Sequence, residues 1–298
     1  ADRLQPVMQE AYRLAYIRKP EFMGNTRTEE KDPKFKVISD LPWSEQEINE
    51  RLAAYRQLSD KVEQEWRALP AQKKETYFQL VKYPVQAAAQ MNNKLLTAQL
   101  ARHGKADWAD SDRAYDSIVS LTKRYNTTKW NRMMDFQPRR LLVFNRVERK
   151  ALSSGLLEKP QAVYTWNGAD CVEGASVICE GLGYEGKAVA VEKKKELTFE
   201  FAAWETDSVE VEVRLLPNHP VEGERLRFTI SLDGSATEAV SYETKGRSEE
   251  WKENVLCNQA VRRMILPVAR KASHRLIFTA LDEGVVLDQI YLYTPRIK

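Results

Sequence analysis

The sequence predicts a multidomain protein of mixed α and β class. An N-terminal antiparallel helical bundle is expected at residues 1–155 and a C-terminal antiparallel β-sandwich at residues 156–298. Apolar residues of the first half recur at spacings of three and four, as on one helix face, whereas those of the second half alternate with polar residues. Ten of the twelve glycines lie in residues 151–298, and the halves differ in charge: residues 1–150 hold 28 basic and 20 acidic side chains, the remainder 18 and 23.

The first two helices are expected at residues 3–17 and 45–69. Ser44 and Glu47, three residues apart and just before an apolar run, form a capping box that predicts where the second helix begins. The apolar residues at helical spacings, which predict the inward faces, are Leu4, Met8, Ala11, Tyr12 and Ala15 in the first helix, and Ile48, Leu52, Tyr55, Leu58, Val62, Trp66 and Leu69 in the second.

A third helix is expected from Pro70 to about residue 102. Pro84 lies inside it and should kink it, because proline removes a backbone donor and crowds the preceding turn. Gly104 ends this helix, a fourth begins at Asp110 or Ser111, and a shorter segment follows over residues 126–147. The residues predicted to face inward in the third helix are Tyr77, Leu80, Val81, Ala88, Met91, Leu95 and Leu100.

Short alternating strands separated by turns predict a sandwich in the second half. Asp233-Gly234 is a turn signal between two of them. The alternating apolar sets are Leu197, Phe199 and Phe201; Val209, Val211, Val213 and Leu215; Leu226, Phe228, Ile230 and Leu232; Leu276, Phe278 and Ala280; and, more weakly, Val286, Asp288, Ile290 and Leu292.

The composition excludes several classes of protein. Charged residues make up 30% and the hydrophobic set 43%, which is typical of a globular protein. No apolar run is long enough for a transmembrane helix, and no signal peptide is visible. A net charge of +3 predicts no nucleic-acid partner, and the three His and three Cys offer no metal-ligand spacing. Phosphate-binding glycine motifs are absent, so we expect no cofactor.

The sequence offers little for catalysis. Carboxylates are plentiful, but Glu210 and Glu212 alternate with valines and are expected to lie on a solvated face. A cysteine nucleophile would need a histidine nearby, and only Cys257 with His219 or His274 offers one in the same domain. Burial of a lone cysteine is the commoner outcome.

A basic stretch runs over residues 122–150 and contains nine Lys or Arg against Asp135 and Glu148, with Tyr125, Trp130, Phe136 and Phe144 interleaved. One interpretation is a polyanion site, for nucleic acid or acidic polysaccharide, with the aromatic rings stacking on bases or sugars. The simpler interpretation is a bundle helix with an aromatic core face and a basic solvated face, and helical spacing favours it.

Several phrases, in order, resemble glycoside hydrolase family 115, the xylan α-1,2-glucuronidases. In the first half they are Arg18-Lys19-Pro20-Glu21-Phe22, residues 77–85 (YFQLVKYPV), residues 87–93 (AAAQMNN) and residues 129–135 (KWNRMMD). In the second half they are residues 215–221 (LLPNHPV), 226–234, 247–256 (RSEEWKENVL) and 281–290. The resemblance covers nearly the whole chain.

This resemblance implies an enzyme that removes glucuronic or 4-O-methylglucuronic acid from xylan. Its catalytic carboxylates would lie upstream, so none is assigned here, and the chain is expected to be the inactive C-terminal part that supports the catalytic domain and dimerisation. The implied partners are the upstream domains of the same polypeptide, xylan-type polysaccharide and a second copy, without membrane or nucleic acid. The implied location is periplasmic or extracellular. The alternative is a stand-alone carbohydrate-binding protein.

Seven residues are candidates for contacts. Asn92 and Asn93 are poor helix formers late in a good helix, whose amides suit an interface or simple surface placement. Trp130 and Arg132 are of types enriched at interface hot spots, and Arg132 or Arg139 could attract glucuronate. In the sandwich, Trp204 is expected by strand parity to face away from the core and Trp251 to fill a loop. Both are candidates for binding sugar, against the commoner alternative of buried structural tryptophans.

Overall fold

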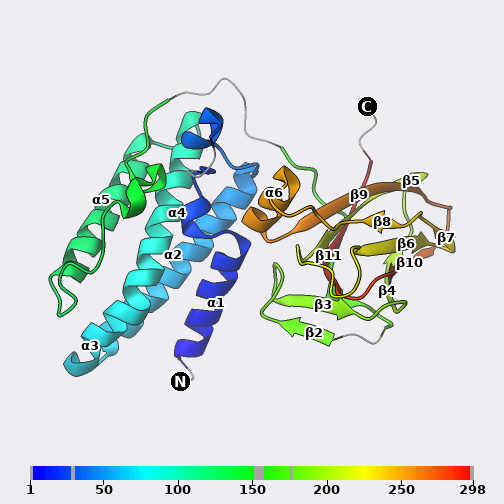
Figure 1. Ribbon diagram of the computed structural model, residues 1–298, viewed down its shortest axis with the longest axis horizontal. Helices are drawn as coiled ribbons and strands as arrows, with labels where there is room; N and C mark the ends of the chain where they lie inside the picture. The colour runs from blue at the N-terminus through cyan, green and yellow to red at the C-terminus, as the bar shows by residue number, and fades with distance from the viewer. Residues whose placement is uncertain (1–2, 28–30, 151–157, 175–176, 296–298) are drawn as a thin grey trace. The chain divides into compact units, whose positions relative to one another are not determined.

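A computed structural model describes residues 3–27, 31–150, 158–174 and 177–295 (Figure 1). The chain divides into two compact units, Ala1–Lys159 and Pro160–Lys298. The first is helical and the second consists mainly of antiparallel strands, as the sequence predicts. Within the described residues, no helix is both long enough and apolar enough to cross a membrane.

The first unit is built on four long helices. These are α1 (Leu4–Ile17), α2 (Glu45–Ala68), α4 (Tyr83–Arg102) and α5 (Trp108–Asn126), and α4 lies between α2 and α5 (Figure 1). The short α3 (Ala71–Tyr77) precedes α4. Single turns complete the unit at η1 (Pro20–Phe22), η2 (Pro33–Lys36), η4 (Pro138–Arg140) and η5 (Leu142–Phe144).

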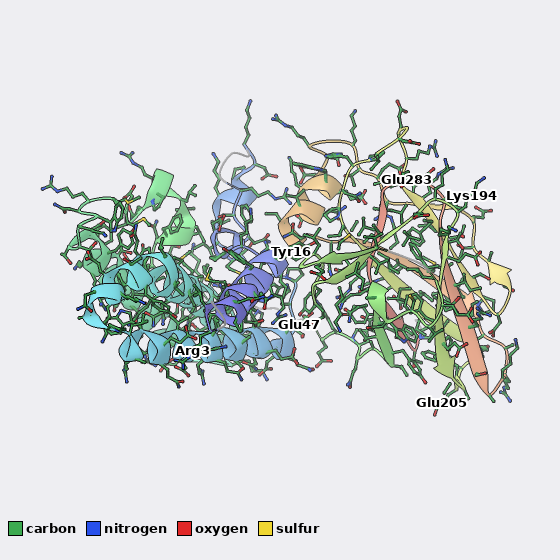
Figure 2. All side chains as sticks on the ribbon, turned by 90° about the horizontal axis from the view of Figure 1, so that it is seen from below. Arg3, Tyr16, Glu47, Lys194, Glu205 and Glu283 are labelled. Atoms are coloured by element: carbon green, nitrogen blue, oxygen red, sulfur yellow. The ribbon has the colours of Figure 1, made fainter. Side chains whose placement is uncertain are left out.

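The capping box at the start of α2 is confirmed. Ser44 Oγ accepts from the Glu47 N–H at 3.2 Å, and Glu47 Oε2 accepts from the Ser44 N–H at 2.7 Å. Figure 2 marks Glu47 at this end of the helix. Two donors that a helix start leaves without intrahelical partners are thereby satisfied.

The inward face predicted for α1 is wrong at its two largest members. The helix buries Val7 and Leu14, seven residues apart, whereas Tyr12 is 67% exposed and Leu4 is 38% exposed. Met8 and Ala11 pack partly against the same core. A spacing of seven residues returns to nearly the same face of a helix, so the buried stripe passes through Val7 and Leu14 instead.

The irregularity expected near Pro84 is a π-helical turn, η3 (Phe78–Lys82), between α3 and α4. The Tyr83 N–H bonds to the Phe78 carbonyl, five residues back, and Pro84, which has no N–H, follows it. The wider turn shifts the helical phase relative to a continuous α-helix. As a result Phe78 and Val81 are buried, while Leu80, predicted to face inward, is 61% exposed.

The second unit is a sandwich of two sheets. The first has the order β2-β3-β11-β5-β9, with β1 paired to β11, and the second has the order β4-β10-β6-β7, with β8 paired to β6. Their bounds are β1 (Tyr164–Asn167), β2 (Val177–Glu180), β3 (Lys187–Val191), β4 (Glu196–Ala202), β5 (Ser208–Leu215), β6 (Arg227–Leu232), β7 (Ser235–Ala236), β8 (Val240–Ser241), β9 (Ala260–Pro267), β10 (Ser273–Ala280) and β11 (Val285–Tyr293).

The core between the sheets is formed by the alternating residues that the sequence indicates. Phe199, Val213, Phe228 and Phe278 all have no exposed surface. Asp233 and Gly234 both have positive φ, 51° and 92°, and turn β6 into β7 as expected. The turn η6 (Gly168–Asp170) and the helix α6 (Glu249–Cys257) complete the unit. The helix α6 was not predicted from the sequence pattern.

A β-bulge in β11 changes the face of one acidic residue. The register with β5 shifts between Leu287 and Gln289, so Leu287, rather than the predicted Val286 and Asp288, lies in the core with Ile290 and Leu292. Asp288 is fully buried outside this core. Its carboxylate accepts from the Tyr184 N–H at 3.0 Å and from Gln259 Nε2 at 2.9 Å. Gly183 has φ +90°, and a Cβ there would collide with Asp288 Oδ1, so this close approach requires glycine.

Candidate functional site

Asn92 lies inside the bundle and has no exposed surface. Its Oδ1 accepts from Arg51 Nε at 2.7 Å, and its Nδ2 donates to the Ala88 carbonyl at 2.8 Å. Arg51 also donates to the Arg18 carbonyl at 2.7 Å. The Asn92 amide therefore connects α4 to α2 within the chain. The neighbouring Asn93 is partly exposed.

The loop after α5 presents Trp130 and Arg132. The Asn126 side chain closes this loop with two hydrogen bonds to Met134. Its Nδ2 donates to the Met134 carbonyl at 2.8 Å, and its Oδ1 accepts from the Met134 N–H at 2.9 Å. Arg132 has φ +58°, a strained value for a side-chain-bearing residue, and is exposed. The Trp130 indole N–H is enclosed and has no partner among the described residues.

Large apolar side chains accompany this loop. Met133 is 59% exposed and Phe136 is 44% exposed. An arginine held in a fixed loop beside exposed Met and Phe has the composition of an interface core. Arg139 lies in η4, and its side chain falls outside the described residues.

The C-terminal end of the basic stretch is neutralised within the bundle. Arg146 donates to Asp112 at 2.8 Å and to Asp116 at 2.6 Å, and Arg149 donates to Asp112 at 2.5 Å. Hydrogen bonds from Arg146 and Arg149 hold the pKa of Asp112 below its ordinary value. These pairs, together with the buried Tyr125, agree with a helix that has a core face and a charged face.

Lys94 is a fully buried cation on α4 with no carboxylate partner among the described residues. Its Nζ donates to the carbonyls of Val143 at 2.5 Å and Asn145 at 2.8 Å. Burial lowers the pKa of Lys94 to about 7. Two N–H groups remain on a neutral amine, enough for both carbonyls, so Lys94 secures the 143–145 segment in either protonation state.

Both tryptophan placements expected in the sandwich are wrong. Trp204 is only 8% exposed, and its indole N–H donates to the Ser208 carbonyl at 2.9 Å. Strand β4 ends at Ala202, so the alternation that predicted an exposed Trp204 no longer applies two residues later. Trp251 is half-buried in the first turn of α6 instead of filling a loop.

Glu212 was expected on a solvated face, and this prediction is wrong. Its side chain points away from the core, but it is only 1% exposed. Its carboxylate accepts from Arg214 Nε at 2.6 Å and from Arg263 Nε, on the neighbouring strand β9, at 2.7 Å. Burial alone would raise the pKa of Glu212, but the two guanidinium groups outweigh it and hold the pKa below its ordinary value. Arg214 in turn lies 3.8 Å over the Tyr291 ring.

Of the two histidines that the cysteine hypothesis offers, His274 lies far from the thiol. His274 is the second residue of β10 and bonds to Asp233 through Nδ1 at 2.8 Å. Cys257 precedes Ala260, which pairs with Leu215 near the opposite end of the sandwich. Strand β10 then continues for six residues, roughly 20 Å, before it reaches that end at Ala280. His274 therefore does not activate Cys257.

Two cavities of the bundle contain carboxylates. One, of about 220 Å³, is lined in part by Asp40 and Glu148, and the other, of about 490 Å³, by Asp116. Each carboxylate already has a cation: Arg102 bonds to Asp40, Lys150 to Glu148 and Arg146 to Asp116. Neither cavity offers the two available carboxyl groups that glycoside hydrolysis uses. The described residues form no cluster of three or more metal-ligating side chains.

Comparison with known proteins identifies the family. Residues 175–298 match the model of the glycosyl hydrolase family 115 C-terminal domain. A solved family 115 4-O-methyl-alpha-glucuronidase, BtGH115A, with specificity for decorated arabinogalactans, matches 99% of the chain at 61% identity and a TM-score of 0.96. The chain belongs to glycoside hydrolase family 115. It spans 39% of the length of this family 115 enzyme.

Matches outside family 115 are distant. A carbohydrate-binding module of Cellvibrio mixtus lichenase 5A, solved with cellotriose, is 13% identical with a TM-score of 0.35, covering 46% of this chain and 100% of the module. A family 35 module from Clostridium thermocellum is 11% identical with a TM-score of 0.35, covering 44% and 98%. Nothing about binding follows from likeness at this level. No curated protein matches the chain.

Proposed function

We propose that this chain is the C-terminal, non-catalytic portion of an α-glucuronidase that releases glucuronic or 4-O-methylglucuronic acid from polysaccharide side chains. The observation that carries the proposal is the 61% identity to a 4-O-methyl-alpha-glucuronidase over 99% of the chain. The TM-score of 0.96 over the same residues supports the same fold for both units.

The pairing of the cavity carboxylates supports a non-catalytic role for these residues. A glycosidase needs one carboxyl group that holds a proton and a second that stays charged and accessible. Asp40 and Asp116 are instead bonded to arginines, whose N–H groups occupy the carboxylate oxygens.

The sequence resemblance and the related enzyme indicate different polysaccharide substrates. The resemblance implied xylan, whereas BtGH115A is specific for decorated arabinogalactans. We therefore propose decorated arabinogalactan as the substrate of the complete enzyme, with glucuronoxylan as the comparison. Polymers of this kind are met outside the cytoplasm, which supports the proposed periplasmic or extracellular location.

The proposed partners are the catalytic part of the same polypeptide and a second copy of the chain. The clamped loop of Trp130 and Arg132, with the exposed Met133 and Phe136, supports a contact of the bundle with one of them. Arg132→Ala should weaken that contact without unfolding the bundle. Sedimentation of the complete polypeptide, with exposed Arg113→Ala as the control, measures the effect on dimerisation.

Release of uronic acid from the two polysaccharides tests the proposed activity. The complete polypeptide should release 4-O-methylglucuronic acid, faster from decorated arabinogalactan than from glucuronoxylan, and the 298 residues alone should release none. Release by the 298 residues alone would contradict the non-catalytic assignment. Faster release from glucuronoxylan would overturn the choice of substrate but not the activity.

A further inference from the structure

The bundle contains an open groove of about 490 Å³ between α2 and α5. Both helices pack on α4, which lies between them (Figure 1). Residues of α4 form the floor of the groove. Gln86 and Gln90 of α4 line the floor, Ser59 of α2 lines one wall, and Ser120 and Arg124 of α5 line the other. Three helices thus direct mostly uncharged polar side chains into one hollow.

Several of these polar groups have hydrogen-bonding capacity left. The Ser59 hydroxyl is enclosed and has no partner among the described residues. Gln90 is half-buried, and its side-chain amide likewise forms no hydrogen bond with the described residues. Ser117 and Ser120 give their hydroxyl protons to the carbonyls of Arg113 and Asp116, which leaves their oxygens able to accept. Amides and hydroxyls that both donate and accept match the hydroxyl groups of a sugar.

Arg124 supplies a fixed positive charge at one end of the groove. Its guanidinium lies 4.2 Å from the centre of the Phe78 ring and 4.8 Å from that of Trp66. The side chain is exposed, and none of the described carboxylates forms an ion pair with it. Stacking on aromatic rings orients the planar fork while its N–H groups stay available for a bidentate acceptor.

Asp116, the other charged residue that lines the groove, is already neutralised. Lys82 is bound to Glu63 at 2.5 Å. Asp116 is bound to Arg146 at 2.6 Å and lies eight residues before Arg124 on α5, roughly 12 Å along the helix axis. Among the residues that line the groove, Arg124 therefore carries the one uncompensated charge, which favours a ligand with a carboxylate at one end and hydroxyl groups along the rest.

We propose that this groove binds an acidic oligosaccharide, with Arg124 holding the uronate carboxylate and Gln86 and Gln90 contacting the sugar hydroxyls. The sugar class rests on the proposed function, since acidic side chains and released uronic acid are the species that such an enzyme encounters. The site lies within the first unit and uses none of the residues assigned to the sandwich. It would retain the polysaccharide or its product on the bundle.

Titration calorimetry of the 298-residue chain tests the proposal without turnover. The probe is a trisaccharide ending in 4-O-methylglucuronate, compared with its reduced form, in which a hydroxymethyl group replaces the carboxylate. The acidic probe should bind about tenfold more tightly, the usual effect of one charge-assisted hydrogen-bond pair. Arg124→Gln should abolish this preference, and Lys123→Gln, an exposed cation on the same helix outside the groove, should retain it.

A second variant covers the hydroxyl contacts. Gln90→Ala should weaken both probes by a similar factor of about five, because an amide contact to a hydroxyl does not depend on the carboxylate. Equal binding of the two probes, absence of binding, or equal losses in Arg124→Gln and Lys123→Gln would each overturn the proposal. Binding by a chain whose complete polypeptide releases no uronic acid would overturn the proposed activity and leave the groove assigned.

Discussion

The two units of this chain bury polar groups in opposite ways. In the bundle, the cations Arg51, Lys82 and Lys94 lie in the interior and bond to carbonyls, an amide or a carboxylate of other elements. In the sandwich, the space between the sheets is apolar apart from His274, which stacks on Phe201, and the buried carboxylate Glu212 lies on the outer side of a sheet. Helices leave few main-chain groups to pair, so side chains must join them, whereas strands are already joined by their ladders.

This difference predicts how each unit responds to mutation. The sandwich should depend mainly on packing volume and be sensitive to truncation of core side chains. The bundle should depend on a few buried hydrogen bonds, each of which holds several elements in register.

Phe278→Ala should have the largest effect on stability and tests the dependence of the sandwich on core packing. Phe278 has no exposed surface and stacks on Phe228 with ring centres 5.1 Å apart. The substitution should lower the free energy of unfolding of the sandwich by about 3–5 kcal/mol. Urea unfolding, with hydrogen exchange to separate the units, measures it, and Ile265→Ala on the exposed face is the control. A loss no larger than that of the control would show that the core is not the source of stability.

Arg51→Met is the matching test in the bundle. It keeps the apolar stem but leaves Asn92 Oδ1 and the Arg18 carbonyl without their donor. We expect the free energy of unfolding of the first unit to fall by about 2–3 kcal/mol, as for buried hydrogen bonds to a charged group. The exposed Arg56→Met is the control. An unchanged bundle would mean that apolar contacts alone fix the helix register.

Lys94 makes the stability of the bundle depend on pH. Its folded pKa of about 7 lies below the ordinary value of 10.5. Between these values the unfolded chain binds a proton there that the folded chain does not, so raising the pH favours the folded state at this residue. The stability of the wild type relative to Lys94→Met should rise from pH 7 to 10, by at most about 1.4 kcal/mol per pH unit. A flat difference would show that Lys94 stays charged in the folded chain.

The smallest expected effects come from removing a serine N-cap of a helix in each unit. Ser44 caps α2 and Ser248 caps α6, each through its Oγ, at 3.2 Å and 3.1 Å from the third N–H of the helix. Replacing either by alanine should cost about 1 kcal/mol in its own unit. Thermal unfolding of the two variants and the double variant measures the effects. They should be additive, and strong coupling between them would mean that the units do not unfold independently.

Local patterns in the sequence predicted most of the fold. The capping box at Ser44, the turn at Asp233-Gly234 and the alternation on β4, β5, β6 and β10 each involve neighbouring residues, and the structure confirms them. The helix α6 was missed because its signal is short: Ser248, two glutamates and the left-handed Asn258 that ends it. The identity of the family came from ordered phrases and not from any physical pattern.

The errors in the predicted placements have two physical causes: a local break in the helix or strand periodicity, and a contact between distant parts of the chain. Leu80 is exposed because a π turn shifts the helix phase, and Trp204 is buried because strand parity ends at Ala202. Glu212 is buried because Arg263, 51 residues away, reaches it from another strand. The groove at Arg124 was not recognised either, because it is formed by three helices and appears in no single segment.

The native size of the polypeptide tests most directly that this chain is the non-catalytic C-terminal part of a family 115 α-glucuronidase. An antibody against these 298 residues, used on a blot of cell and medium fractions, reports that size. We predict a band far above the 34.4 kDa of the chain, in a fraction that releases 4-O-methylglucuronic acid. A band at 34.4 kDa only would contradict the account and indicate a protein that works without a catalytic domain.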